Sequence, residues 1–93
     1  MESALDTIDE KIKPYVMTLR QAGIETIESC QGGDGHSSPE PFIRFAGDYA
    51  EGYKAFAIAL NYDFPLLKLC LTYDVDKQVL KGPYWDMVFK PFS

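Results

Sequence analysis

The chain is poor in the residues that build metal clusters and disulfide frameworks. It holds two cysteines and one histidine, and the cysteines, Cys30 and Cys70, do not form a Cys-x-x-Cys pair. This spacing excludes a zinc ribbon and a thioredoxin-like redox motif. The N-terminal residues are acidic and lack an apolar core, so no secretory signal is expected. We therefore expect reduced thiols and a cytoplasmic location.

Basic residues and long apolar runs are also scarce. Nine Lys and Arg residues stand against 14 Asp and Glu, which gives a formal net charge of −5, and the basic residues are scattered along the chain. Proteins that bind nucleic-acid backbones carry a basic stripe, so binding to DNA or RNA is not expected. No segment approaches the roughly 18 apolar residues of a membrane span. A small anionic ligand remains compatible with this charge, because backbone amides can bind an anion locally.

What remains is the composition of a globular protein. Hydrophobic residues make up 46% of the chain and aromatic residues 14%, which is typical of a folded protein rather than a disordered one. We expect residues 1–93 to form a single domain with one compact core. A core this small leaves little stability to spare, so assembly into a homo-oligomer would be a natural supplement.

Apolar residues at spacings of three and four predict two helices. The first covers residues 5–19; Pro14 either kinks it or opens its main part, and Gly23 follows it as a stop. The second covers residues 48–61, with Asp48 as the N-cap. The predicted buried stripe of the second helix consists of Tyr49, Tyr53, Phe56, Ala57 and Leu60.

Alternating or short apolar runs predict four strands. They cover residues 24–30, 42–46, 67–75 and 84–90, with a turn over residues 76–83 before the last strand. The resulting order is helix, strand, strand, helix, strand, strand. We therefore predict an α+β fold in which two helices pack on one face of a four-stranded, mainly antiparallel sheet.

The segment after the first strand is the most informative part of the chain. It reads Glu28-Ser29-Cys30-Gln31-Gly32-Gly33-Asp34-Gly35-His36. Glycines permit positive φ and close approach to the backbone, and successive amides can form an anion-binding nest. The spacing is neither a Walker A loop nor a dinucleotide fingerprint. The alternative interpretation is a flexible, solvated hairpin loop.

Cys30 has three interpretations. It is a small apolar residue buried at a strand end, a nucleophile activated by His36, or a metal ligand. Catalysis would need a third orienting group, for which Glu28 or Asp34 is available. Zinc needs three or four ligands, and Asp34 or Glu28 would have to complete the set. We therefore expect no metal site and no cofactor.

Arg44 lies on the second predicted strand, on the face opposite Ile43 and Phe45. A surface ion pair with Glu25 or Glu28 is one interpretation. A clamp for a phosphate or carboxylate group beside the glycine-rich loop is the other.

The last strand brings aromatic and acidic side chains together. Tyr84 and Trp85 are either core residues or a stacking platform for a planar ring. Asp86 is either a surface carboxylate or an acceptor for the hydrogen bonds of a base or ribose. Alternation places Trp85 with Met87 and Phe89 on one face of the strand and Tyr84 with Asp86 and Val88 on the other.

Four segments of the chain resemble a known pattern. Residues 23–36 resemble a signature of small, largely uncharacterised bacteriophage and prophage proteins, Gly-Ile-x-Thr followed by Glu-Ser-Cys-x-Gly-Gly-x-Gly-His. Residues 41–45, 51–52 and 82–87 fit the rest of that pattern, although many such proteins carry Glu where this chain has Asp86. The resemblance implies a phage protein acting in the bacterial cytoplasm. Phage proteins of this size are often counter-defence factors, and some sequester nucleotide immune signals.

Together these observations predict a non-enzymatic protein that binds a small anionic, nucleotide-like molecule. The predicted ligand-binding residues are Glu28, Ser29, Cys30, Gly32, Gly33, Asp34, Gly35, His36, Arg44, Tyr84, Trp85 and Asp86. Two alternatives remain open. One is a small hydrolase or transferase that uses Cys30, His36 and Glu28. The other is an acidic module that binds and inhibits a host protein.

Overall fold

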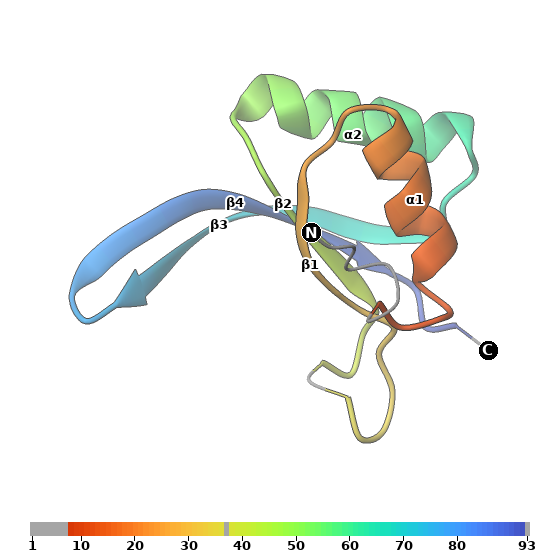
Figure 1. Ribbon diagram of the computed structural model, residues 1–93, viewed down its shortest axis with the longest axis horizontal. Coiled ribbons are helices and arrows are strands. Elements are labelled where there is room, and N and C mark those ends of the chain that lie inside the picture. Colours follow the sequence, from red (N-terminus) through yellow and green to blue (C-terminus); the bar gives the residue numbers. More distant parts are fainter. Residues whose placement is uncertain (1–7, 37, 93) are drawn as a thin grey trace.

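The computed structural model describes residues 8–36 and 38–92, which form an α+β structure (Figure 1). The four strands make one antiparallel sheet in the order β1-β2-β4-β3. The α+β class is therefore confirmed, and the element order agrees broadly with the prediction. The elements are α1 (Lys13–Gln21), β1 (Thr26–Cys30), β2 (Phe42–Ala46), α2 (Tyr49–Asn61), β3 (Leu66–Asp76) and β4 (Val79–Phe89).

Helix α1 begins at Lys13, so Pro14 opens the helix rather than kinking it. This position suits proline, because the first residues of a helix have no intrahelical acceptor for their amides. The helix buries Val16 and Leu19, and the amide of Gly23 caps it by donating to the carbonyl of Arg20 at 3.0 Å. Residues 5–7 of the predicted helix lie outside the described residues.

Helix α2 begins as predicted, because the Asp48 carboxylate accepts a hydrogen bond from the Glu51 amide at 3.2 Å. The prediction of its buried stripe is wrong. The helix buries its small residues and exposes its large ones: Tyr49 is 67% exposed, Tyr53 74% and Leu60 61%. The buried residues are Gly52, Ala55 and Ala59.

Close approach of α2 to the sheet explains this reversal. A Cβ atom on Gly52 would overlap the indole ring of Trp85, so only glycine lets the helix lie this near β4. Ala55 and Ala59 are also small and fully or almost fully buried. Small side chains at the contact let the helix lie close to the sheet. The large side chains of the helix then do not fit into the contact and lie beside it.

The predicted turn over residues 76–83 is also wrong. Strands β3 and β4 continue to Asp76 and from Val79, and the chain reverses over Lys77 and Gln78 alone. Both turn residues have positive φ, 51° and 65°, as a tight two-residue hairpin turn requires. The outer part of this hairpin projects well beyond the helices as a curved two-stranded arm (Figure 1).

The core is one buried cluster. It joins side chains of the strands with Val16 and Leu19 of α1 and with Ala55 and Ala59 of α2. The shared face predicted for Trp85, Met87 and Phe89 of β4 is confirmed, because all three belong to this cluster. Ile43 and Phe45 of β2 are buried with them. No described helix has the length and apolar character needed to cross a membrane.

Candidate functional site

The face of the sheet that points away from the core carries a row of polar residues across all four strands. Glu28 of β1 pairs with Arg44 of β2, Arg44 pairs with Asp86 of β4, and Asp86 pairs with Cys70 of β3. We call this side the polar face. Side chains alternate between the two faces of a strand, so these residues lie opposite the buried Phe45 and Trp85. Three residues predicted for the site, Glu28, Arg44 and Asp86, therefore share one row.

Arg44 is the centre of a network on the polar face. Its guanidinium donates two hydrogen bonds to Asp86, at 2.8 and 3.1 Å, and one to Asp74 at 2.7 Å. The Thr72 hydroxyl donates to Asp86 at 3.4 Å, and the guanidinium lies 5.0 Å from the centre of the Tyr84 ring. The hydrogen bond with Asp86 raises the pKa of Arg44, although partial burial acts in the opposite direction.

The predicted ion-pair partners of Arg44 are therefore wrong. Within the described residues, Arg44 forms ion pairs with Asp74 and Asp86 and with neither Glu25 nor Glu28. Asp74 was missed because its distance from Arg44 depends on the pairing of β3 with β4, in which the register shifts between Thr72 and Asp74. Strict alternation along β3 could have pointed to Asp74 as a neighbour of Arg44, because it places Asp74 on the same face of the strand as Thr72.

A shallow pocket of about 230 Å³ opens on the polar face beside Arg44. We call it the sheet pocket. Glu40 and Asp86 are the acidic residues in its lining, and Phe42 and Val88 are the apolar ones. Its complete lining is Ser38, Glu40, Phe42, Arg44, Asp86 and Val88.

The glycines of the β1–β2 loop serve the shape of the loop itself. A Cβ on Gly32 would lie 2.7 Å from the backbone nitrogen of Pro41, so glycine lets the two limbs of the loop meet. The Gly33 amide donates to the carbonyl of Pro39 at 3.1 Å, which closes the same contact. Gly33 and Gly35 have positive φ of 99° and 82° and open space around them. The amides of Gly32 and Gly33 thus already have acceptors within the protein.

The loop also gathers a second cluster, formed by Asp9, Cys30 and His36. One ligating atom from each residue lies within 4.8 Å of the others. His36 Nδ1 is 3.5 Å from Asp9 Oδ2, and the Gln31 amide donates to the same carboxylate oxygen at 3.0 Å. The Gly32 amide points at Cys30 Sγ, 3.4 Å away. We call these three residues the thiol cluster.

Asp9 was not among the candidate residues of the sequence. The third polar group near Cys30 and His36 is this aspartate and neither Glu28 nor Asp34. Asp9 precedes α1, and its carbonyl accepts a hydrogen bond from the Lys13 amide at 3.1 Å. No local spacing links it to the loop, because the contact depends on how the segment before α1 crosses the end of β1.

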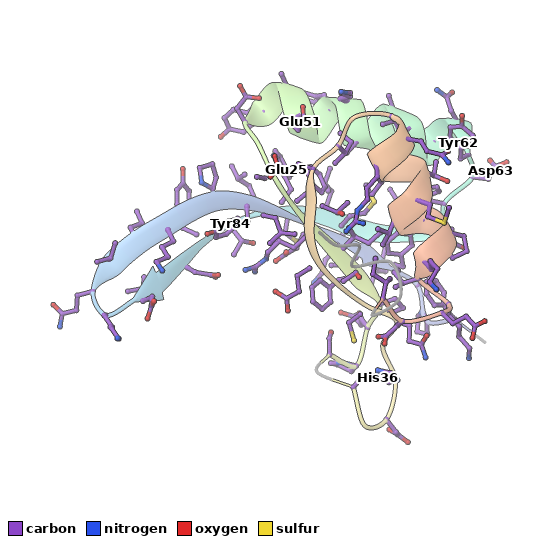
Figure 2. The ribbon with its side chains drawn as sticks, viewed as in Figure 1. Glu25, His36, Glu51, Tyr62, Asp63 and Tyr84 are labelled. Carbon is purple, nitrogen blue, oxygen red and sulfur yellow. The ribbon has the colours of Figure 1, made fainter. Side chains whose placement is uncertain are left out.

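The predicted ligand-binding residues therefore fall into separate groups. Figure 2 shows His36 on the loop and Tyr84 well away from it, near the base of the projecting hairpin. Ser29 pairs with Ile43, which places it on the core side of the sheet. Trp85 is also on that side, where its indole N–H donates to the Asp48 carbonyl at 2.9 Å. The polar face keeps Glu28, Arg44, Tyr84 and Asp86. The end of β1 holds Cys30, and the loop after it holds Gly32, Gly33, Asp34, Gly35 and His36.

In comparisons with known proteins, no family model, no curated protein and no solved structure matches this chain. The resemblance to phage proteins therefore stays a prediction.

Proposed function

We propose that the protein is a non-enzymatic binding protein whose sheet pocket holds a small, flat ligand rich in hydrogen-bond donors. The observation that carries this proposal is the excess of carboxylates around Arg44. Asp86 and Asp74 already outnumber the single guanidinium, and Glu40 is a further acidic residue in the lining of the pocket. A ligand that donates hydrogen bonds to these carboxylates forms charge-assisted bonds, whereas a phosphate would meet repulsion.

In this proposal both helices pack on the face of the sheet opposite the sheet pocket. The buried cluster that joins α1, α2 and the inward strand residues supports this arrangement. It leaves the polar face open, so the sheet pocket is accessible to a ligand. Binding sites of this kind are concave and mostly apolar, with a few polar groups that fix orientation.

The walls of the pocket favour a planar ring. Phe42 and Val88 offer apolar contact, and the guanidinium of Arg44, another lining residue, lies 5.0 Å from the centre of the Tyr84 ring. A nucleobase with an exocyclic amino group fits this set, because the amino group faces a carboxylate and the ring faces apolar side chains. In this proposal a nucleotide-like ligand is recognised through its base. If the protein is a phage protein, a nucleotide immune signal of the host is a ligand of this class.

Calorimetry with nucleosides and their monophosphates tests the proposal. We expect adenosine and cytidine to bind and uridine, which lacks the exocyclic amino group, to bind at least about tenfold more weakly. A nucleoside and its monophosphate should bind with similar affinity. Recognition of an anion by the glycine-rich loop would instead make the monophosphate bind much more tightly. No binding of any nucleoside, by calorimetry and native mass spectrometry, would refute base recognition.

Two substitutions provide matched variants for this measurement. Glu40→Gln removes one charge from the lining of the pocket and leaves the ion pairs of Arg44 in place, so we expect it to weaken adenosine binding by about tenfold. Asp76→Asn removes an exposed carboxylate that pairs with Lys81 on the hairpin arm and should leave binding unchanged. Equal affinities for both variants would place the ligand elsewhere.

A further inference from the structure

We propose that the thiol cluster, Asp9, Cys30 and His36, is a zinc-binding site. These residues supply a sulfur, an imidazole nitrogen and a carboxylate oxygen, the three ligand types that Zn²⁺ uses in proteins. The three ligating atoms already lie within 4.8 Å of one another, so small side-chain movements suffice to bring them around one ion. The site is distinct from the sheet pocket and does not depend on the function proposed for it.

Backbone amides hold two of the three ligands in a form suited to a metal. The Gly32 N–H points at Cys30 Sγ, 3.4 Å away, and so helps to fix the position of the sulfur. The Gln31 N–H donates to Asp9 Oδ2 and fixes the carboxylate next to the histidine. Hydrogen bonds of this kind orient metal ligands and raise metal affinity.

The glycine-rich loop brings the third ligand back to the strand end. Positive φ at Gly32, Gly33 and Gly35 reverses the chain within a few residues. This reversal places His36 beside Asp9 instead of extending it into solvent. The same glycines therefore explain why the single histidine of the chain lies next to a cysteine.

The donor set favours zinc over the hard cations. Calcium and magnesium prefer oxygen ligands, whereas a set with one thiolate and one imidazole suits Zn²⁺. Three protein ligands leave the fourth tetrahedral position for water. Cys30 is buried, but the side chains of His36 and Asp9 are 31% and 33% exposed, so an ion can reach the cluster from solvent.

Cobalt substitution is the direct test, because Co²⁺ takes zinc sites and reports its ligands in its absorption spectrum. We expect one equivalent of Co²⁺ to give tetrahedral d–d bands and a thiolate-to-metal charge-transfer band, and Zn²⁺ to displace it. Cys30→Ser should remove the charge-transfer band, and Cys70→Ser should retain it. A spectrum without a thiolate band, or one that Cys30→Ser leaves unchanged, would overturn the proposal.

Two further variants keep the test decisive if Cys30→Ser does not fold. Asp9→Asn retains an acceptor for the Gln31 amide but removes the ligand charge, and His36→Asn changes a partly exposed side chain. Zinc at about a hundredfold excess over its dissociation constant should raise the melting temperature of the unmodified protein by on the order of 10 °C. Both variants should lose most of this shift. An equal shift in all three proteins would place the ion elsewhere.

A different observation supports a second proposal, which concerns the exposed apolar side of α2. Tyr49, Tyr53 and Phe56 border a groove of about 280 Å³ whose other walls are Gly52, Leu69 and Trp85. We call it the apolar groove. Leu60 of α2 and Leu67, Tyr73 and Val75 of β3 are also exposed. Exposed apolar patches often mark surfaces that bind another protein.

We infer that a second copy of this chain covers the apolar groove. Strand β3 is an edge of the sheet, and within residues 8–36 and 38–92 no strand pairs with the outer side of its 11 residues. Two β3 strands that pair antiparallel around Leu71 would place Lys68 opposite Asp74 and Leu69 opposite Tyr73. The charges on one strand are thus complementary to those on its copy.

The size of the surface agrees with a stable dimer. The exposed apolar side chains of α2 and β3 provide on the order of 800 Å² on each copy, which is the usual contribution of one partner to a specific interface. Antiparallel pairing of two β3 strands also places both α2 helices on the same side of the combined sheet. The apolar grooves of the two copies then face each other across the symmetry axis.

Sedimentation equilibrium tests this second proposal. We expect a dimer at micromolar concentration, conversion to a monomer by Tyr53→Glu, and an intact dimer for Ile27→Glu, which changes an exposed apolar residue on the opposite edge strand. In a Cys70→Ser background, Leu71→Cys should form a disulfide between copies under oxidation. A monomeric unmodified protein would overturn the proposal and assign the groove to another partner. A dimer that survives Tyr53→Glu and does not cross-link at position 71 would also overturn it.

Discussion

Arg44 and Asp86 are joined side by side across β2 and β4, with Nε–Oδ1 and Nη2–Oδ2 distances of 2.8 and 3.1 Å. Such a two-point contact needs the planar guanidinium, which lysine cannot reproduce. Both side chains are only about one-fifth exposed, at 19% and 21%, so water screens the pair incompletely. This pair is the most strongly bonded feature of the polar face.

Removal of Arg44 should destabilise the protein more than removal of an exposed lysine. Arg44→Ala leaves Asp74 and Asp86 close together without a cation, and we expect a loss of about 2 kcal/mol in the free energy of unfolding. Lys81→Ala breaks an exposed pair with Asp76 and should cost less than about 0.5 kcal/mol. Urea unfolding of the two variants checks this difference. Equal losses would mean that the Arg44 network is fully screened by water.

The contribution of Arg44 should not vary with pH on the alkaline side of neutrality. Its pKa is raised in the folded state, chiefly by the hydrogen bond with Asp86. A raised pKa stabilises the fold below the unfolded pKa, and this stabilisation is lost only as the pH rises through the folded value. Both values lie above the working range, so the difference in unfolding free energy between the unmodified protein and Arg44→Ala should stay constant from about pH 7 to 10. A fall in this difference across that range would contradict the assignment.

Gly52→Ala should destabilise the protein although alanine is the better helix former. Helix propensity alone predicts a gain of about 1 kcal/mol. The added Cβ would overlap the Trp85 indole, so we expect a net loss of about 1–3 kcal/mol instead. Trp85 is the single tryptophan, and its fluorescence should change with the substitution. A stabilised variant with unchanged fluorescence would show that α2 lies farther from the sheet.

Gly32→Ala and Gly33→Ala form a matched pair in the β1–β2 loop. Both positions have positive φ, so both substitutions carry the same kind of backbone strain. Only at position 32 would the new methyl group meet backbone atoms, those of Glu40 and Pro41 at 2.8 and 2.7 Å. We expect Gly32→Ala to cost at least about 1 kcal/mol more than Gly33→Ala in thermal or urea unfolding. Equal costs would indicate that the loop limbs do not meet.

The order in which the two cysteines react with iodoacetamide should distinguish a structural Cys30 from a catalytic Cys30. Cys30 is 4% exposed beneath the loop, whereas Cys70 is partly exposed on the polar face. We expect Cys70 to be alkylated faster at pH 7, as peptide mass mapping can show. Added zinc should slow Cys30 further and leave Cys70 unchanged. Faster alkylation of Cys30 in the metal-free protein would favour the cysteine hydrolase alternative.

The sequence predicts where the helices and strands lie better than it predicts which of their faces are buried. The borders of β2 and α2 follow from local signals, namely an apolar run and an Asp48 cap, and they agree with the structure. The exposed stripe of α2 could not be read from periodicity, because a stripe of large apolar residues looks the same whether it faces the core or a partner. Gly52 was the available signal, since glycine within a helix often marks close packing.

The candidate site depends even more on contacts that join distant segments. The sequence singled out Arg44 and Asp86 individually, but only strand order places them side by side. Asp9 reaches the loop through the path of the chain before α1, which no spacing encodes. Gly82 and Pro83 were interpreted as a turn, yet they lie within β4, where the pairing with β3 shifts register.

The tip of the β3–β4 arm offers a place to modify the molecule without disturbing either proposed site. Lys77 and Gln78 are exposed, far along the arm from the helices and the loop (Figure 1). Their backbone conformation suits Asn-Gly, so that replacement should retain the turn. A fluorophore or a short peptide tag inserted between these two residues would therefore report ligand and metal binding from outside both of those sites.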